Sequence, residues 1–129
     1  MERLVQFFQM VLNSLNFVYL EGGKFMSISD EIQENLKKRR SINQDDDFGL
    51  ERSWEELTNI LSKNEDETIK YLMNCSKDDV LFISSVFDYV SENLQSKKFI
   101  SCLRELDKKY PDLKLTSFID DAEDYIKDN

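Results

Sequence analysis

Paired carboxylates are the side chains of this chain that could most readily do chemistry. Two neighbouring carboxyl groups can act as general acid and general base, or hold metal ions around a substrate. The pairs are Glu55/Glu56, Asp78/Asp79 and Asp120/Asp121. Each pair falls in the first turn of a predicted helix, where carboxylates stabilise the positive end of the helix dipole, and neither a Gly-rich loop nor metal-ligand spacing accompanies it. The sequence therefore predicts no catalytic residues, and we expect that the protein is not an enzyme.

The other residue types that support catalysis or metal binding are scarce. The chain contains no histidine, the commonest acid–base residue. Cys75 and Cys102 have no CxxC spacing, so we expect two buried thiols in a reducing cytoplasm and no zinc site. Asp45, Asp46 and Asp47 resemble part of a calcium loop, but the central Gly and terminal Glu of an EF-hand are not at the required spacing. We therefore expect no metal and no cofactor.

The overall charge narrows the classes of partner. The 26 acidic and 17 basic residues give a net charge of −9, which repels the phosphates of nucleic acids and anionic lipids and attracts basic proteins. We therefore expect no nucleic-acid partner and no membrane partner. With 129 residues and 40% hydrophobic residues, the chain is long enough for one folded domain.

The elements that must position these side chains are predicted to be helices, because apolar residues recur at helical spacing along most of the chain. Only three Gly and one Pro are present, which disfavours a sheet with many tight turns. We predict an all-α domain of six helices, or five if the first frays, whose antiparallel pairs could stack in a HEAT-like manner. The expected helices cover residues 29–40, 53–62, 64–74, 76–94, 97–110 and 117–126, and a loop is expected over 43–49.

The helix starts rest on capping residues. Ser53, Asn64, Ser76 and Ser117 each precede an acidic residue that can complete a capping box. The helix after Ser76 is expected to run unbroken through residue 94 as the central core helix, because its apolar residues keep helical spacing throughout. It should pack face to face with the 97–110 helix, since the connection between the two is short.

Residues 1–25 form a separate segment of the predicted organisation, before a helical domain over 26–129. The codons that Glu21 to Met26 would use resemble a bacterial ribosome-binding site followed by a start codon, which makes Met26 a candidate first residue. Residues 1–25 would then be translated upstream sequence. Two alternatives stay open: an N-terminal helix docked on the domain, and a membrane anchor, although the apolar stretch is short and polar for a bilayer span. Mass spectrometry of the native protein tests the start at Met26, because an intact N-terminus at Met1 would contradict it.

The candidate partner-binding residues are charged and aromatic side chains that are not explained by the apolar faces of the predicted helices. The last predicted helix places like charges at i, i+3 and i+4, with only Lys127 to offset them. Phe82 and Tyr89 lie off the main apolar stripe and could be exposed anchors. A solvated acidic face and ordinary core aromatics are the simpler explanations. The predicted partner-binding residues are Asp78, Asp79, Phe82, Tyr89, Asp120, Asp121 and Asp124.

Five segments of the chain share a pattern with one known family. They are residues 53–57 (SWEEL), 71–76 (YLMNCS), 82–87 (FISSVF), 94–100 (LQSKKFI) and 109–113 (KYPDL). Together they resemble a family of small bacterial immunity proteins that accompany polymorphic or contact-dependent-inhibition toxins, over about residues 27 to 128. The resemblance implies a cytoplasmic inhibitor that binds one cognate toxin and blocks its active site, commonly a nuclease with a basic cleft. The alternative is a helical scaffold or adaptor that inhibits nothing.

Overall fold

Helices account for most of the described chain, as the all-α prediction requires. The computed structural model describes residues 17–19 and 25–127. Two short antiparallel strands, β1 (Phe17–Tyr19) and β2 (Phe25–Ser27), precede the helices, with Val18 opposite Met26. The rest of residues 1–25 lies outside the described residues, so the alternatives for that segment stay predictions. In the described part, no helix is long and apolar enough to cross a membrane.

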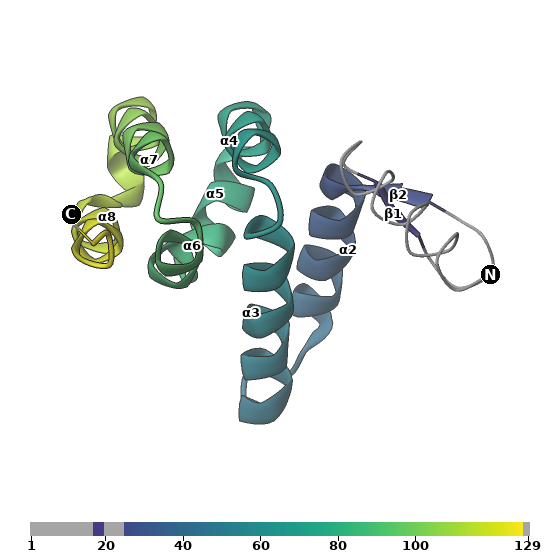
Figure 1. Ribbon diagram of the computed structural model, residues 1–129. Coiled ribbons are helices and arrows are strands. Elements are labelled where there is room, and N and C mark those ends of the chain that lie inside the picture. The colour runs from purple at the N-terminus through teal and green to yellow at the C-terminus, as the bar shows by residue number, and fades with distance from the viewer. Residues whose placement is uncertain (1–16, 20–24, 128–129) are drawn as a thin grey trace, which may run out of the picture.

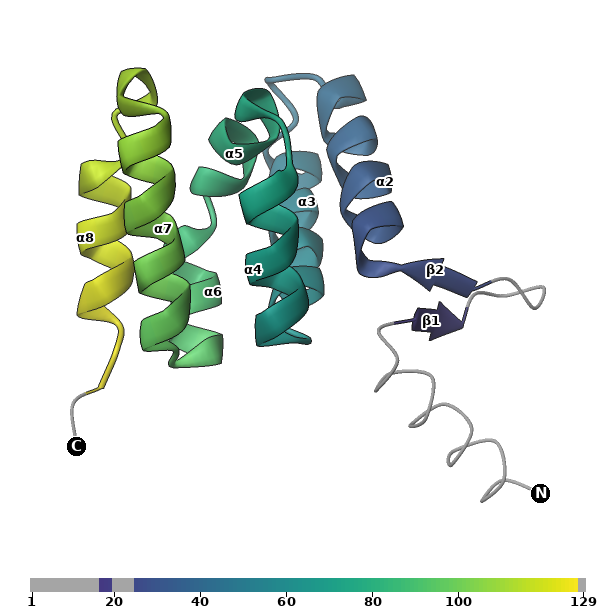
Figure 2. The same cartoon turned by 90° about the horizontal axis from the view of Figure 1, so that it is seen from above.

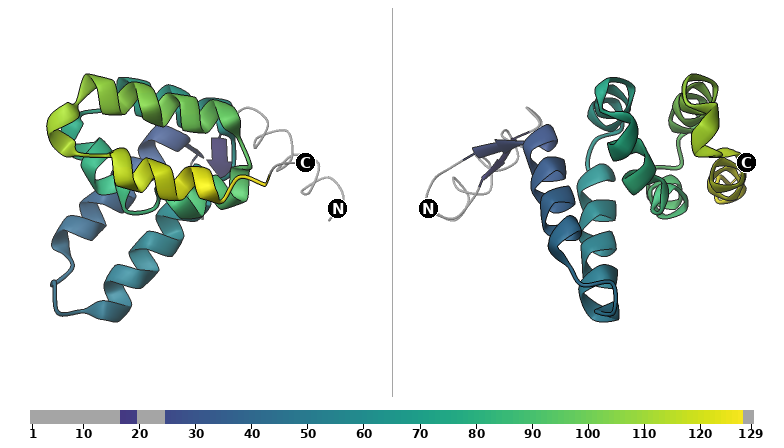
Figure 3. Two further views of the ribbon diagram at one scale, coloured as in Figure 1. Left: turned by 90° about the vertical axis from the view of Figure 1, so that its left-hand side faces the viewer. Right: turned by 180° about the vertical axis from the view of Figure 1, so that it is seen from behind.

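Seven α-helices and one 3-10 turn follow the strands in the described residues, where five or six helices were predicted. They are α2 (Ile28–Ser41), α3 (Asp47–Leu61), α4 (Glu65–Asn74), α5 (Lys77–Ser84), α6 (Phe87–Leu94), α7 (Lys97–Lys109), η1 (Pro111–Leu113) and α8 (Thr116–Asp124). The helices stand side by side in a row from α2 to α8 (Figure 2). At the α8 end of the row, α4 and α7 form one layer and α6 and α8 form the other (Figure 1). The tip of the α2–α3 hairpin projects beyond the remaining helices (Figure 3).

Three predicted helix starts are confirmed by their capping geometry. The Asn64 side chain accepts a hydrogen bond from the backbone N–H of Glu67 at 3.0 Å. The Ser76 and Ser96 hydroxyl oxygens accept equivalent bonds, at 3.2 and 2.9 Å. Each cap satisfies a backbone donor that the first helical turn leaves free. These contacts span three residues, which is why they could be predicted locally.

Two predicted caps are wrong. Helix α3 begins six residues before Ser53, at Asp47, because the Asp46 carboxylate accepts the Gly49 N–H at 2.9 Å and supplies the cap. A Cβ atom on Gly49 would lie 2.5 Å from that carboxylate, so glycine permits this close approach. The predicted loop over 43–49 is therefore correct only up to Asp46. Ser117 lies inside α8, whose start at Thr116 has no side-chain cap.

The predicted 76–94 helix is two helices. Its backbone breaks between α5 and α6, where Val86 has φ −116° and ψ 9°. The hydroxyls of Ser84 and Ser85 donate to the carbonyl oxygens of Leu81 and Phe82, at 2.5 and 2.9 Å, and such local bonds bend helices. The break also changes the direction of the chain, so that Val86 and Phe87 are both fully buried.

The core lies between the two helical layers. The Phe87 and Phe99 rings meet edge to face with centroids 6.4 Å apart, so α6 contacts α7 as predicted. Helix α6 also packs along α8, where the buried Ser91 hydroxyl donates to the Ala122 carbonyl at 2.5 Å. The position of α6 beside α3 and α8, and not beside α7 alone, creates the surface described next.

Candidate partner-binding site

A groove of about 500 Å³ opens between α3 and α6. Helix α3 contributes Glu51, Trp54 and Glu55, and helix α6 contributes Tyr89, Glu92 and Asn93. We call this surface the acidic groove. No lysine or arginine lines it. Its lining combines three glutamates with two aromatic side chains, Trp54 and Tyr89.

Helical spacing explains why these side chains share one surface. Glu51 and Glu55 are one turn apart on α3, while Leu57 and Leu61 of the same helix are buried in the core. The outward face of α3 is therefore the acidic one. Helix α6 is held beside it by a hydrogen bond from the Asn93 amide to the Ser62 hydroxyl, 3.0 Å long.

The three glutamates of the acidic groove are solvent-exposed. Among the residues that the structure describes, none of Glu51, Glu55 and Glu92 forms an ion pair. Like charges one helical turn apart, as in Glu51 and Glu55, destabilise a helix by about 0.2–0.5 kcal/mol. The groove therefore has a negative electrostatic potential, and the charges that produce it do not stabilise helix α3.

Two aromatic side chains lie among these carboxylates. Trp54 is 36% exposed and Tyr89 is 53% exposed. Trp54 also borders a smaller hollow of about 170 Å³ between α2, α3 and α5, where the Arg39 guanidinium carbon lies 5.8 Å from its ring centroid. Arg39 lines that hollow but not the groove.

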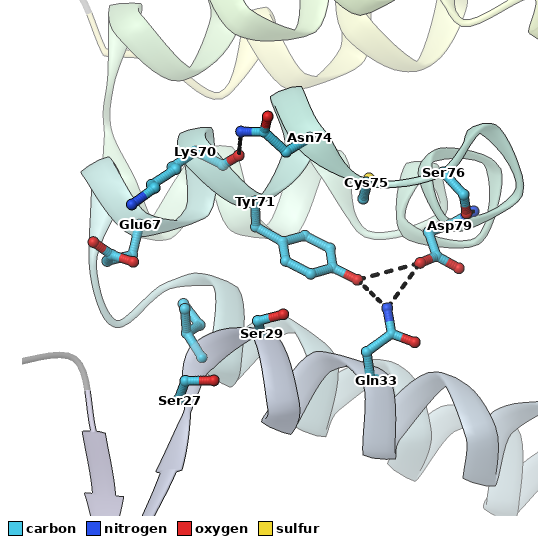
Figure 4. Close-up of a pocket in the computed structure, with 11 residues that line it drawn as sticks. Ser27, Ser29, Gln33, Glu67, Lys70, Tyr71, Asn74, Cys75, Ser76 and Asp79 are labelled. Atoms are coloured by element: carbon cyan, nitrogen blue, oxygen red, sulfur yellow. Dashed lines mark hydrogen bonds between the residues drawn. The ribbon is translucent and has the colours of Figure 1, made fainter.

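A second polar site joins α2, α4 and α5 at a pocket of about 540 Å³ (Figure 4). The buried Asp79 carboxylate accepts hydrogen bonds from Gln33 at 2.9 Å, Arg40 at 3.1 Å and Tyr71 at 3.2 Å. The Gln33 amide also donates to the Tyr71 hydroxyl at 2.5 Å. These contacts tie three helices together, with the charge of Asp79 balanced by Arg40.

The phenol of Tyr71 and the thiol of Cys75 in this pocket keep their protons at neutral pH. Burial, and then the negative charge of Asp79, raise the pKa of Tyr71 above its usual value. The same two causes raise the pKa of the Cys75 thiol from 9.0 to about 11. A protonated phenol and thiol are weak bases and nucleophiles. The arrangement is suited to holding helices together more than to proton transfer.

The predicted partner-binding residues are spread over several surfaces, and only Tyr89 lines the acidic groove. Asp78 is exposed, whereas its neighbour Asp79 is enclosed in the polar site. Phe82 is half-buried beneath the Arg40 guanidinium, 4.8 Å from its ring centroid. Asp121 and Asp124 are exposed on α8.

The interpretation of α8 as carrying unrelieved charge needs a correction. The Arg104 guanidinium of α7 lies 2.9 Å from the Asp120 carboxylate and 3.6 Å from that of Glu123. Both acids therefore have a basic partner on the neighbouring helix, which sequence spacing did not reveal. The sequence does contain one signal for the groove that was missed, namely Glu51 and Glu55 at i, i+4 next to Trp54.

Comparisons of the chain with protein-family models, curated proteins and solved structures give no match.

Proposed function

We propose that the protein is an immunity protein that binds a basic cognate toxin through the acidic groove and neutralises it. One observation carries the proposal: three exposed glutamates without ion-pair partners in the described residues surround two exposed aromatic side chains. Exposed aromatics are typical anchors of protein interfaces. Complementary charge around them speeds encounter and disfavours wrong partners.

The proposed mechanism is occlusion. Both walls of the groove are helices whose opposite faces are buried, so the backbone that carries the glutamates is fixed before the partner arrives. A toxin whose active-site cleft is basic, such as a nuclease, would be covered by this surface, and its substrate would be excluded. The proposal involves no catalytic step, no cofactor, no nucleic-acid or membrane partner, and places the protein in the cytoplasm. The resemblance to immunity proteins supports the same function.

Co-expression tests this function. The C-terminal domain encoded by the gene immediately upstream is expressed with and without this protein, and cell growth is measured. We expect the domain to be toxic alone and harmless with the protein. If the domain is harmless alone, or equally lethal in both cases, the immunity function is wrong.

A matched pair of variants locates the interface. Glu51→Gln/Glu55→Gln/Glu92→Gln should lose protection, since it removes the charge of the groove. The control Asp78→Asn/Asp121→Asn/Asp124→Asn removes the same number of charges from other exposed positions and should keep protection. Protection lost only in the second variant would move the interface to α5 and α8.

The alternative is a non-catalytic scaffold or adaptor. The two-layered row of helices supports it, because stacked antiparallel helix pairs of the HEAT type build extended binding surfaces. A scaffold would bind its partner without changing that partner's activity. Assay of the purified upstream domain with and without the protein separates the two functions.

A further inference from the structure

We propose that the acidic groove selects an arginine side chain of its partner over a lysine. The inference rests on the proposed function only in taking the partner to be a basic protein. It concerns which basic side chain occupies the groove, and its test uses peptides in place of the toxin.

The placement of the carboxylates favours a planar cation with several donors. Glu51 and Glu55 lie on the α3 wall, and Glu92 lies on the α6 wall. A guanidinium carries five N–H donors in a fixed fork, so it can bond carboxylates on two sides at once, whereas an ammonium is a compact point charge. Arginine therefore makes better use of acceptors that come from two helices.

The aromatic side chains add to this preference. A guanidinium can stack on a ring with less loss of hydration than an ammonium. The chain already shows this contact at Trp54 itself, where the Arg39 guanidinium carbon lies 5.8 Å from the ring centroid. Tyr89, exposed on the facing helix, offers a second ring. The groove volume of about 500 Å³ lies within the range typical of ligand pockets.

A direct test uses the fact that Trp54 is the only tryptophan of the chain. Its fluorescence and its indole N–H resonance in NMR report occupancy of the groove without a label. The probes are the blocked peptides acetyl-Gly-Arg-Arg-Gly-amide and acetyl-Gly-Lys-Lys-Gly-amide, which carry equal charge. We expect the arginine peptide to shift the indole resonance and to bind at least about threefold more tightly than the lysine peptide.

Two outcomes of the titration would overturn the inference. One is equal affinity for the two peptides. The other is an indole resonance that moves with neither peptide at concentrations up to about 20 mM. A contact strong enough to contribute to partner binding would be detected at that concentration. Binding of the arginine peptide should also weaken as salt is added, because the contact is partly exposed.

Matched variants show whether the effect is local. Glu51→Gln/Glu55→Gln/Glu92→Gln should weaken arginine-peptide binding about tenfold, whereas Asp78→Asn/Asp121→Asn/Asp124→Asn should change it less than about twofold. Equal loss in both would mean that net charge alone attracts the peptide, which contradicts the inference. Tyr89→Ala should lower the preference for arginine, and Phe118→Ala, at another exposed aromatic, should not.

The peptide and co-expression experiments fail independently. Arginine-selective binding by a protein that does not protect cells would leave the inference standing and remove the immunity function. Protection of cells by a protein that has no preference for arginine would leave the immunity function standing and remove the inference.

Discussion

Asp78 and Asp79 are adjacent in sequence and have opposite environments. Asp79 is 7% exposed and accepts bonds from three side chains, while Asp78 is exposed. Helical geometry turns neighbouring side chains about 100° apart, so one faces α2 and the other faces solvent. A pair of carboxylates in the sequence is thus one structural residue and one surface residue.

Removing the buried carboxylate should be far more costly than removing the exposed one. Asp79→Ala leaves Gln33, Arg40 and Tyr71 without their acceptor, and we expect the free energy of unfolding to fall by about 1–3 kcal/mol. Asp78→Ala should cost less than about 1 kcal/mol, the range of a helix-dipole contact. Urea unfolding of both variants measures the difference. Equal costs would contradict the role assigned to the polar site.

The thiol of Cys75 should react slowly and in a pH-dependent way. With its pKa raised from 9.0 to about 11, its thiolate fraction near pH 8 is about 100-fold smaller than that of a thiol with a pKa of 9.0. Alkylation should accelerate with each pH unit up to about 11. Timed labelling followed by mass spectrometry measures the rate.

The same labelling experiment tests the charge of Asp79. Because that carboxylate helps to raise the pKa of Cys75, Asp79→Asn should lower it and speed labelling. Cys102 is the internal control, since burial and Cys75 raise its pKa and Asp79 does not contribute. Acceleration at both cysteines would indicate local unfolding in place of a charge effect.

At the scale of elements, helix starts were predictable where the cap was correctly identified. Asn64 and Ser76 cap as expected, and Ser96 caps the helix whose start was predicted directly after it. Ser53 fits the same local pattern but lies inside α3, because Asp46 caps this helix earlier in the chain. A capping pattern thus indicates where a helix can begin, but it does not choose between two candidate caps in one segment.

Substitutions at the two candidate caps of α3 distinguish them. Asp46→Ala should lower the free energy of unfolding by about 1 kcal/mol, the usual cost of losing an N-cap. Ser53→Ala should be near neutral, since its hydroxyl caps nothing. Thermal or urea unfolding decides, and a larger loss at Ser53 would restore the predicted boundary.

The connections after α6 and η1 both use left-handed backbone at residues other than glycine. Lys114 has φ 54° and an exposed side chain, so Lys114→Gly should stabilise the fold by about 0.5–1 kcal/mol. Gln95 has φ 48°, but its amide bonds the Tyr125 carbonyl at 2.7 Å and the Lys127 N–H at 2.9 Å. Gln95→Gly should therefore gain nothing in unfolding experiments. A gain there equal to that at Lys114 would mean that these bonds contribute little.

At the scale of the whole molecule, pairing of charges matters more than their sum. The net charge of −9 includes acids bound by arginines, such as Asp79 with Arg40 and Asp120 with Arg104. The groove glutamates lack such partners in the described residues. Their charge is therefore available for association, as is that of other exposed acids without an ion pair in that part of the chain, such as Asp121 and Asp124.

Association with the cognate toxin should reflect this distribution. We expect the association rate to fall steeply as NaCl is raised, because exposed charges are screened. Glu51→Gln/Glu55→Gln/Glu92→Gln should flatten that dependence, and Asp121→Asn/Asp124→Asn should leave most of it, as measured by stopped-flow mixing. The opposite order would assign the encounter surface to α8.

The sequence by itself determined the helical class and the starts of three capped helices. These follow from contacts within one or two helical turns, which local spacing records. Only the tertiary structure decided where the long predicted helix breaks, which carboxylates are paired and which surface is left acidic. Arg40 and Asp79 lie 39 residues apart, and the groove forms only where α3 meets α6. Such pairings depend on the path of the chain in space, and the spacing of residues along it does not encode that path.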